Sequence, residues 1–176
     1  MNLRVPDPPL SDGVVTLRPP DERDLPAIDL GVRDPDVVRW LGQPETSAAD
    51  LLALNRTRWV AGSPTFSICE SDDVCVGHCW VNRSSSEATV GSIGYWLLPS
   101  ARGRGLATRA VRLLTAWTVH DLGLTRLRLF TEPANERSQR VAERSGFRRI
   151  GILPSHAEID GRPIDQVLFE FSPEGN

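Results

Sequence analysis

The sequence predicts a single domain of the mixed α/β class. Its 176 residues include 40% hydrophobic and 24% charged side chains, which is typical of a globular protein with a substantial core. The early strand-like segments follow one another through short polar turns, whereas the later ones alternate with helical patterns. Because hairpins join antiparallel strands and helices join parallel ones, this order predicts a mixed sheet.

The N-terminal half alternates short helices and strands. Residues 1–12 are rich in proline and are expected to form a flexible lead-in, with the domain itself spanning 13–176. The patterns predict a strand at 14–18, helices at 21–30, 34–41 and about 47–61, and a hairpin of strands 66–70 and 74–82 turning at 71–73. Either Thr46 or Ser47 is expected to cap the third helix.

The C-terminal half has a clearer alternation. A strand at about 88–98 precedes a helix at about 103–120, and Gly123 is expected to end that helix. The helix has an apolar stripe, formed by Leu106, Ala110, Leu113, Leu114 and Trp117. A strand at 126–131, a helix from the Asn135 cap to Gly146, a strand at 147–152 and a hairpin turn at 159–162 leading into a strand at 167–171 complete the pattern.

The junction after Pro99 carries the most specific signal for function. The run Arg102-Gly103-Arg104-Gly105-Leu106-Ala107 lies between a predicted strand and a predicted helix. The glycines allow a tight turn and a close approach of a ligand to the backbone. The free N–H groups and the positive end of the helix dipole favour an anion, above all a phosphate. Arg102 and Arg104 would add fixed positive charge.

Two kinds of phosphate site do not fit this junction. A Walker A loop requires a lysine, and all 20 basic residues of this chain are arginine. A Rossmann fingerprint requires a small residue where Thr108 stands and an acidic residue about 20 positions further on, and neither is present.

The third interpretation is a resemblance to a known family. Arg102, Gly105 and Ala107 match the Gln/Arg-x-x-Gly-x-Gly/Ala signature of the acyl-coenzyme A loop in the GNAT superfamily of N-acyltransferases. A second segment resembles the same family through an Asn-x-x-Ser motif, an apolar position and a terminal Gly-Phe. These positions are Asn135, Ser138, Val141, Gly146 and Phe147. The resemblance covers about 14–171 and is closest to the Rim-type branch, which acetylates N-termini of ribosomal proteins and, in other members, small amines.

The resemblance implies the GNAT fold and acetyl-coenzyme A as the cofactor. The fold has a central mixed, twisted sheet of about seven strands, splayed after the fourth and flanked by four or five helices. The splay would leave backbone groups free along Tyr95–Leu98, where the pantetheine arm can pair. The residues expected to bind the cofactor are Trp96, Leu97, Leu98, Arg102, Gly103, Arg104, Gly105, Leu106, Ala107, Thr108, Asn135, Ser138 and Arg140. For Arg140, exposure to solvent is the alternative reading.

The resemblance also implies direct acetyl transfer to a primary amine in a ternary complex. The backbone amides near Trp96 and Leu97 would stabilise the oxyanion, and Ser138 is expected near the sulfur. The branch usually has a glutamate as general base, and here Ser92 occupies that position. A water held by Ser92 is one alternative, and His78, Glu70 or Glu158 is another. His78 would lie opposite Ser92 if paired positions sum to 170.

A non-catalytic sensor or partner module that holds acyl-coenzyme A remains the alternative function, and the missing glutamate favours it. Cys69, Cys75 and Cys79 with His78 superficially suggest a metal site. We expect no metal there, because strand alternation would place Cys75 and Cys79 on one face and His78 on the other. Cys69 is expected across the hairpin from Cys75, where oxidation could link the two thiols.

Composition excludes several classes of partner. A net charge of −3 argues against a nucleic-acid partner. No apolar run approaches the length that a membrane span needs, and the N-terminal residues lack the apolar core of a signal peptide. The expected location is therefore cytoplasmic, and the expected assembly is a monomer or a homodimer.

Overall fold

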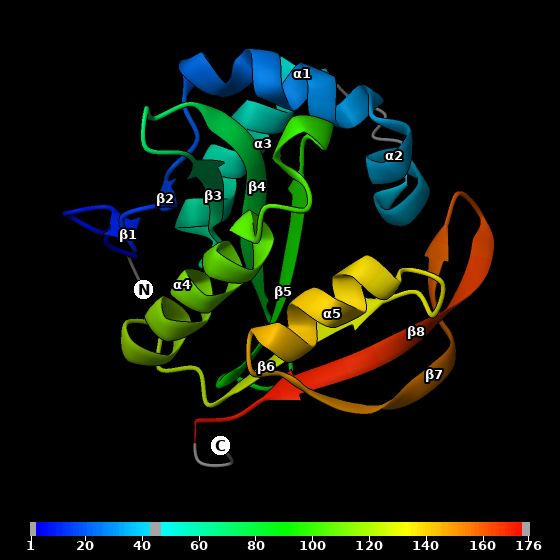
Figure 1. Cartoon of the computed structure of the whole chain (residues 1–176). Coiled ribbons are helices and arrows are strands. Elements are labelled where there is room, and N and C mark those ends of the chain that lie inside the picture. The colour runs from blue at the N-terminus through cyan, green and yellow to red at the C-terminus, as the bar shows by residue number, and fades with distance from the viewer. Residues whose placement is uncertain (1–2, 43–46, 174–176) are drawn as a thin grey trace.

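The structure is a computed structural model that describes residues 3–42 and 47–173. One twisted sheet is flanked by helices (Figure 1). The strands are β1 (Leu10–Ser11), β2 (Thr16–Arg18), β3 (Thr65–Cys69), β4 (Cys75–Arg83), β5 (Val90–Leu97), β6 (Arg126–Thr131), β7 (Arg148–Ile159) and β8 (Arg162–Phe171). The helices are α1 (Leu25–Arg33), α2 (Pro35–Leu41), α3 (Ala48–Val60), α4 (Leu106–His120) and α5 (Glu136–Arg144), with 3-10 turns η1 (Glu22–Asp24) and η2 (Pro99–Ala101).

The sheet is mixed, as predicted. Its described part has eight strands in the order β1-β2-β3-β4-β5-β6-β8-β7, and β5 and β6 form its parallel pair. Seven of these strands were predicted, and β1 is the additional one. It lies within the segment expected to be a flexible lead-in, and its Leu10 pairs with Leu17 of β2. The final hairpin is also longer than predicted, since β7 continues to Ile159 and β8 begins at Arg162.

The sheet splays open between β5 and β6. These strands pair over three positions only, where Val90–Ser92 of β5 lies beside Arg126–Arg128 of β6. Beyond Ser92, β5 continues to Leu97 with no partner strand on that side in the described parts of the chain, and the two strands diverge in Figure 1. The predicted splay is therefore confirmed. It follows the strand that was expected to be the fourth, which is labelled β5 because β1 was not predicted.

Helix α4 closes the main core on one face of β4 and β5. Leu106, Ala110, Leu114 and Trp117 are buried as the stripe predicted, while Leu113 is half-buried at its edge. Helix α3 begins at the cap residue Ser47, whose side chain accepts the Asp50 amide at 3.2 Å. Thr46, the alternative cap, lies outside the described residues.

A smaller cluster lies on the opposite face of the sheet, beneath α1. It contains Ala27, Cys69, Cys75 and Leu98, with Trp96 packed against it. Cys79 instead belongs to the main core on the α4 side. The prediction that Cys75 and Cys79 share a face is thus wrong.

A β-bulge causes this difference. Cys69 pairs with Cys75, but Ile68 pairs with Gly77, so β4 carries one extra residue there. The extra residue reverses the alternation of faces and brings Cys75 onto the same face as His78. Gly77 permits the local approach of β5, because a Cβ atom at this position would lie 2.2 Å from the Trp96 carbonyl oxygen.

The register that would place His78 opposite Ser92 does not occur between β4 and β5. His78 pairs with Trp96, and Ser92 pairs with Asn82, so paired positions do not sum to 170. His78 and Ser92 are therefore separated by four positions along the sheet, roughly 13 Å.

Candidate functional site

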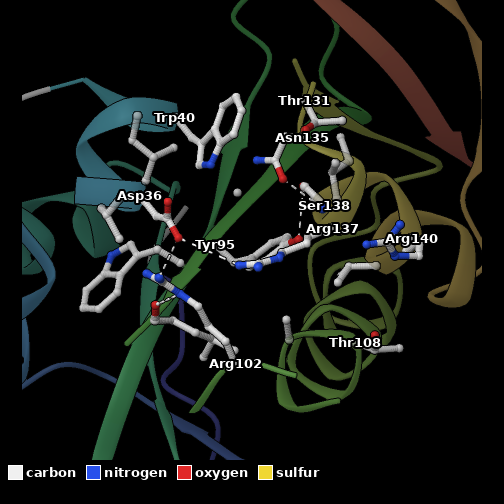
Figure 2. A pocket seen from close by; sticks show the side chains of 18 of the residues that line it. Asp36, Trp40, Tyr95, Arg102, Thr108, Thr131, Asn135, Arg137, Ser138 and Arg140 are labelled. Atoms are coloured by element: carbon white, nitrogen blue, oxygen red, sulfur yellow. Dashed lines mark hydrogen bonds and ion pairs between the residues drawn. The ribbon is translucent and has the colours of Figure 1, made fainter. Parts of the chain in front are cut away.

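The splay between β5 and β6 holds a cavity of about 770 Å³. Helices α2, α4 and α5 and the strand β8 contribute to its walls (Figure 2). Eleven of the predicted cofactor residues line it, namely Trp96, Leu97, Arg102, Gly103, Gly105, Leu106, Ala107, Thr108, Asn135, Ser138 and Arg140. Leu98 and Arg104 do not line it: Leu98 packs in the small cluster beneath α1, and Arg104 pairs with Glu70 at 2.6 Å.

The N-terminus of α4 opens into this cavity. Gly105 is its N-cap residue and has φ +79°, a left-handed conformation that a side chain would strain. Among the described residues, no side chain caps this helix and no atom lies within 4 Å of where a Cβ atom at Gly105 would be. The first-turn N–H groups of α4 therefore face open space, as an anion site requires.

The positive charge expected at this loop is already compensated. The Arg102 guanidinium pairs with Asp34 and, at 3.0 Å, with Asp36, and its Nε donates to the Leu97 carbonyl at 3.0 Å. Burial works to raise the pKa of Asp34, but the hydrogen bonds from Arg102 and the Val37 amide, together with the Arg102 charge, lower that pKa overall. Arg102 thus ties the end of β5 to the start of α2.

Other arginines line a second hollow at the N-terminus of α4. This hollow of about 490 Å³ adjoins the first, and Gly105, Thr108 and Arg144 line both. Arg109 and Arg112 also line the second hollow. The Arg109 side chain pairs with Asp12 at 2.7 Å, whereas no ion pair engages Arg144 among the described residues.

Two hydrogen bonds fix the motif residues of α5. The Asn135 side chain caps the helix by accepting the Ser138 amide at 3.1 Å. The Tyr95 hydroxyl, from β5, donates to Ser138 Oγ at 3.1 Å across the splay (Figure 2). Burial raises the pKa of Tyr95 to about 12, so its hydroxyl remains a proton donor throughout the neutral range.

The free edge of β5 presents particular backbone groups to the cavity. The Leu98 amide donates to the Val76 carbonyl of β4 at 2.8 Å. Because backbone groups alternate in direction along a strand, those of Trp96 also face β4, whereas those of Tyr95 and Leu97 face the gap. Of the two amides expected to hold an oxyanion, the Leu97 amide is therefore the one directed at the cavity.

None of the side chains considered as a base on sequence grounds lines this cavity. Ser92, His78, Glu70 and Glu158 all lie outside it. Two carboxylates do line it, Asp36 and Glu132.

The two cavity carboxylates differ in their partners. Asp36 pairs with Arg102 at 3.0 Å and lies 3.9 Å from Arg137. For Glu132, the described residues provide no ion pair or side-chain hydrogen bond. Beside it, the buried Thr131 hydroxyl also lacks a hydrogen-bond partner within the described chain.

Sequence reasoning missed several residues that line the cavity. The sequence predicts a role only for the backbone of Tyr95, although its side chain carries a signal too, since a buried tyrosine hydroxyl needs a polar partner. Trp40, Ile164 and Gln166 reach the cavity from α2 and β8. They have no local motif, because only the tertiary packing of these elements brings them to the splay.

Comparison with known proteins agrees with this geometry. The acetyltransferase (GNAT) domain family matches residues 15–148. "Probable N-acetyltransferase YjcK" of Bacillus subtilis is 39% identical over 83 residues, which cover 47% of this chain and 46% of that relative. The chain therefore spans about half the length of this curated relative. "Uncharacterized N-acetyltransferase p20" of Bacillus licheniformis is 29% identical over 88% of this chain and 90% of its own length.

A solved structure shares the whole architecture. RimJ of Mycobacterium smegmatis, in complex with CoA-disulfide, superposes with a TM-score of 0.82 and 27% identity. The superposition covers 98% of this chain and 86% of RimJ. Separately, no described helix has both the length and the apolar composition needed to cross a membrane.

Proposed function

The chain belongs to the GNAT acetyltransferase family, and we propose that it transfers an acetyl group from acetyl-coenzyme A to a primary amine. The observation that carries this proposal is the uncapped N-terminus of α4 at Gly105, opening into a cavity beside the free edge of β5. Because the chain belongs to this family, we expect coenzyme A to be the ligand whose phosphates bind here. RimJ, a structural relative, was solved with a coenzyme A derivative.

The cofactor would lie along three features of the cavity. Its pyrophosphate would meet the first-turn N–H groups of α4, with the unpaired Arg144 guanidinium on the outer side. Its pantetheine amides would pair with the backbone of Tyr95 on the free edge of β5, since the Leu97 carbonyl already accepts from Arg102. Its thioester would then reach the region of Ser138 and Thr131, two residues that line the cavity.

The chemistry requires a base, an oxyanion donor and an acid. Glu132 would accept the proton of the amine, since its carboxylate lines the cavity and no described residue neutralises it. The Leu97 amide would stabilise the oxyanion. The Tyr95–Ser138 pair would deliver a proton to the departing thiolate, with Ser138 as the group nearest the sulfur.

The acceptor would be a protein N-terminus or a small amine. It would enter between α2 and β8, where Trp40, Ile164 and Gln166 line the cavity. We also propose that the protein works in the cytoplasm, where acetyl-coenzyme A is abundant, and that residues 13–176 act as one functional domain.

A thiol-release assay tests this function. The protein is mixed with acetyl-coenzyme A and a panel of peptides and small primary amines, and free thiol is measured. Release that depends on an amine, and that falls at least tenfold in Glu132→Gln with unchanged coenzyme A affinity, is expected. Binding of acetyl-coenzyme A without release for any amine would instead favour the non-catalytic sensor.

A further inference from the structure

A second group of reactive side chains lies beneath α1, outside the acetyl-transfer cavity. Cys69 and Cys75 are cross-strand partners in the β3–β4 hairpin, and neither forms a disulfide. The β-bulge brings His78 to the same face as Cys75, and Asp24 lies beside both. Cys69 is fully buried, while Cys75 and His78 are 7% and 4% exposed.

The two thiols differ in acidity. The hydrogen bond from Cys69, followed by that from His78, lowers the pKa of the Cys75 thiol against the opposing effect of burial. The contact with Cys75 and burial both raise the pKa of the Cys69 thiol. Asp24 also faces this pair, and its negative charge opposes ionisation of both thiols. Of the two thiols, Cys75 is therefore the more readily ionised and the better nucleophile.

A metal ion is a weaker interpretation of the same residues. Potential ligand atoms of Asp24, Cys75 and His78 all lie within 4.8 Å of one another. However, Arg18 already pairs with both carboxylate oxygens of Asp24, at 2.8 and 2.9 Å, and Ser67 donates to one of them at 2.6 Å. A metal would have to displace or approach this buried cation, which costs electrostatic energy.

We propose that Cys69 and Cys75 form a peroxide-reactive dithiol site in which Cys75 attacks and Cys69 resolves. Cys75 retains slight exposure, and hydrogen peroxide is close to water in size, so the oxidant reaches Cys75 first. The proposal is independent of acetyl transfer, because it uses none of the residues that line the cofactor cavity.

The reaction proceeds in two balanced steps. The Cys75 thiolate attacks one oxygen of hydrogen peroxide, the O–O bond breaks, and the departing hydroxide takes up a proton to become water. Cys75 is now a sulfenic acid. The Cys69 sulfur loses its proton and attacks the Cys75 sulfur, the S–O bond breaks, and a second water leaves. In total, two thiols and one peroxide give one disulfide and two waters.

The site adjoins the strand that lines the cofactor cavity. The carbonyl of Val76, next to Cys75, accepts the Leu98 amide at 2.8 Å, and the His78 ring lies 5.1 Å from that of Trp96. On the other strand, Glu70 follows Cys69 and pairs with Arg104. A disulfide would therefore form beside the β5–α4 junction.

Thiol titration after peroxide treatment tests the proposal. The folded protein is exposed to hydrogen peroxide, then denatured, and its free thiols are counted while peptide mapping locates any disulfide. Two of the three thiols should disappear together, in a Cys69–Cys75 link. Retention of all three thiols, or a link that includes Cys79, would overturn the proposal.

Variants separate the two roles. Cys69→Ser should stop at a dimedone-reactive sulfenic acid on Cys75, and Cys75→Ser should lose no thiol. Cys79→Ser is the matched control, because Cys79 is fully buried on the other face of the sheet and burial raises the pKa of its thiol. In this variant, Cys69 and Cys75 should oxidise at the wild-type rate. His78→Gln should slow the first step roughly tenfold near neutral pH. Equal rates in wild type and Cys75→Ser would contradict the assignment.

Discussion

Ser138 is held in place by two hydrogen bonds, one local in the sequence and one from a distant strand. Its amide is held by the Asn135 cap within α5, and its hydroxyl is held by Tyr95 from β5. The first contact follows from a local Asn-x-x-Ser motif and could be predicted from the sequence. The second joins residues 43 positions apart, which no local pattern encodes.

The Tyr95–Ser138 pair should matter for turnover more than for cofactor affinity. We expect Ser138→Ala and Tyr95→Phe each to lower kcat roughly tenfold to a hundredfold, because in the proposed reaction the pair acts only as the thiolate leaves. Steady-state kinetics and calorimetry with coenzyme A provide the measurements. Ser86→Ala, in the exposed β4–β5 turn, is the control. A normal kcat in both variants would leave the pair with a structural role only.

At the scale of elements, local patterns predicted the helices well and the strand faces less well. The α4 stripe and the Asn135 cap depend on neighbours three or four positions away, and both are observed. The faces of β4 depend on a one-residue bulge, which changes every assignment beyond it. Gly77 was the available signal, because a glycine within a strand often marks a bulge.

Asp24 joins three elements and provides a prediction at this scale. It lies in η1, pairs with Arg18 of β2 and accepts from Ser67 of β3. Asp24→Asn should lower the free energy of unfolding at pH 7 by about 3–5 kcal/mol, since it leaves a buried arginine without its main partner. Asp29→Asn, which removes an exposed pair with Arg33, should cost less than about 1 kcal/mol.

The pH dependence of this effect has a definite sign. Burial works to raise the pKa of Asp24, but the hydrogen bonds from Arg18, Ser67 and the Asp21 amide, together with the Arg18 charge, lower it overall. The folded-state pKa therefore lies below the ordinary value of 3.8. The stabilisation is therefore complete above that value and is lost as pH falls through the lower folded-state pKa. Urea unfolding at several pH values should show the wild-type advantage shrinking only below about pH 4. An advantage that did not change with pH would contradict this account.

At the scale of the whole molecule, the site exists because the sheet splays. Three paired positions hold β5 to β6, and the remaining length of β5 forms one wall of the cavity. The resemblance of two short motifs predicted this architecture and eleven of the residues that line the cavity, fewer than half of them. It could not predict that Asp34 and Asp36 neutralise Arg102, because α2 reaches the loop only through the tertiary fold.

The central claim is that the N-terminus of α4 binds the phosphates of acetyl-coenzyme A. The most direct measurement is calorimetric titration of coenzyme A into Gly105→Val and its matched control Gly123→Val. Both glycines have positive φ and open space around the missing Cβ atom, but Gly123 lies beyond the far end of α4, roughly 25 Å away. Both variants should therefore carry a similar backbone strain, and circular dichroism is used to check that each is folded. The account predicts at least a tenfold loss of affinity in Gly105→Val and wild-type affinity in Gly123→Val, whereas equal affinity in the two folded variants would contradict it.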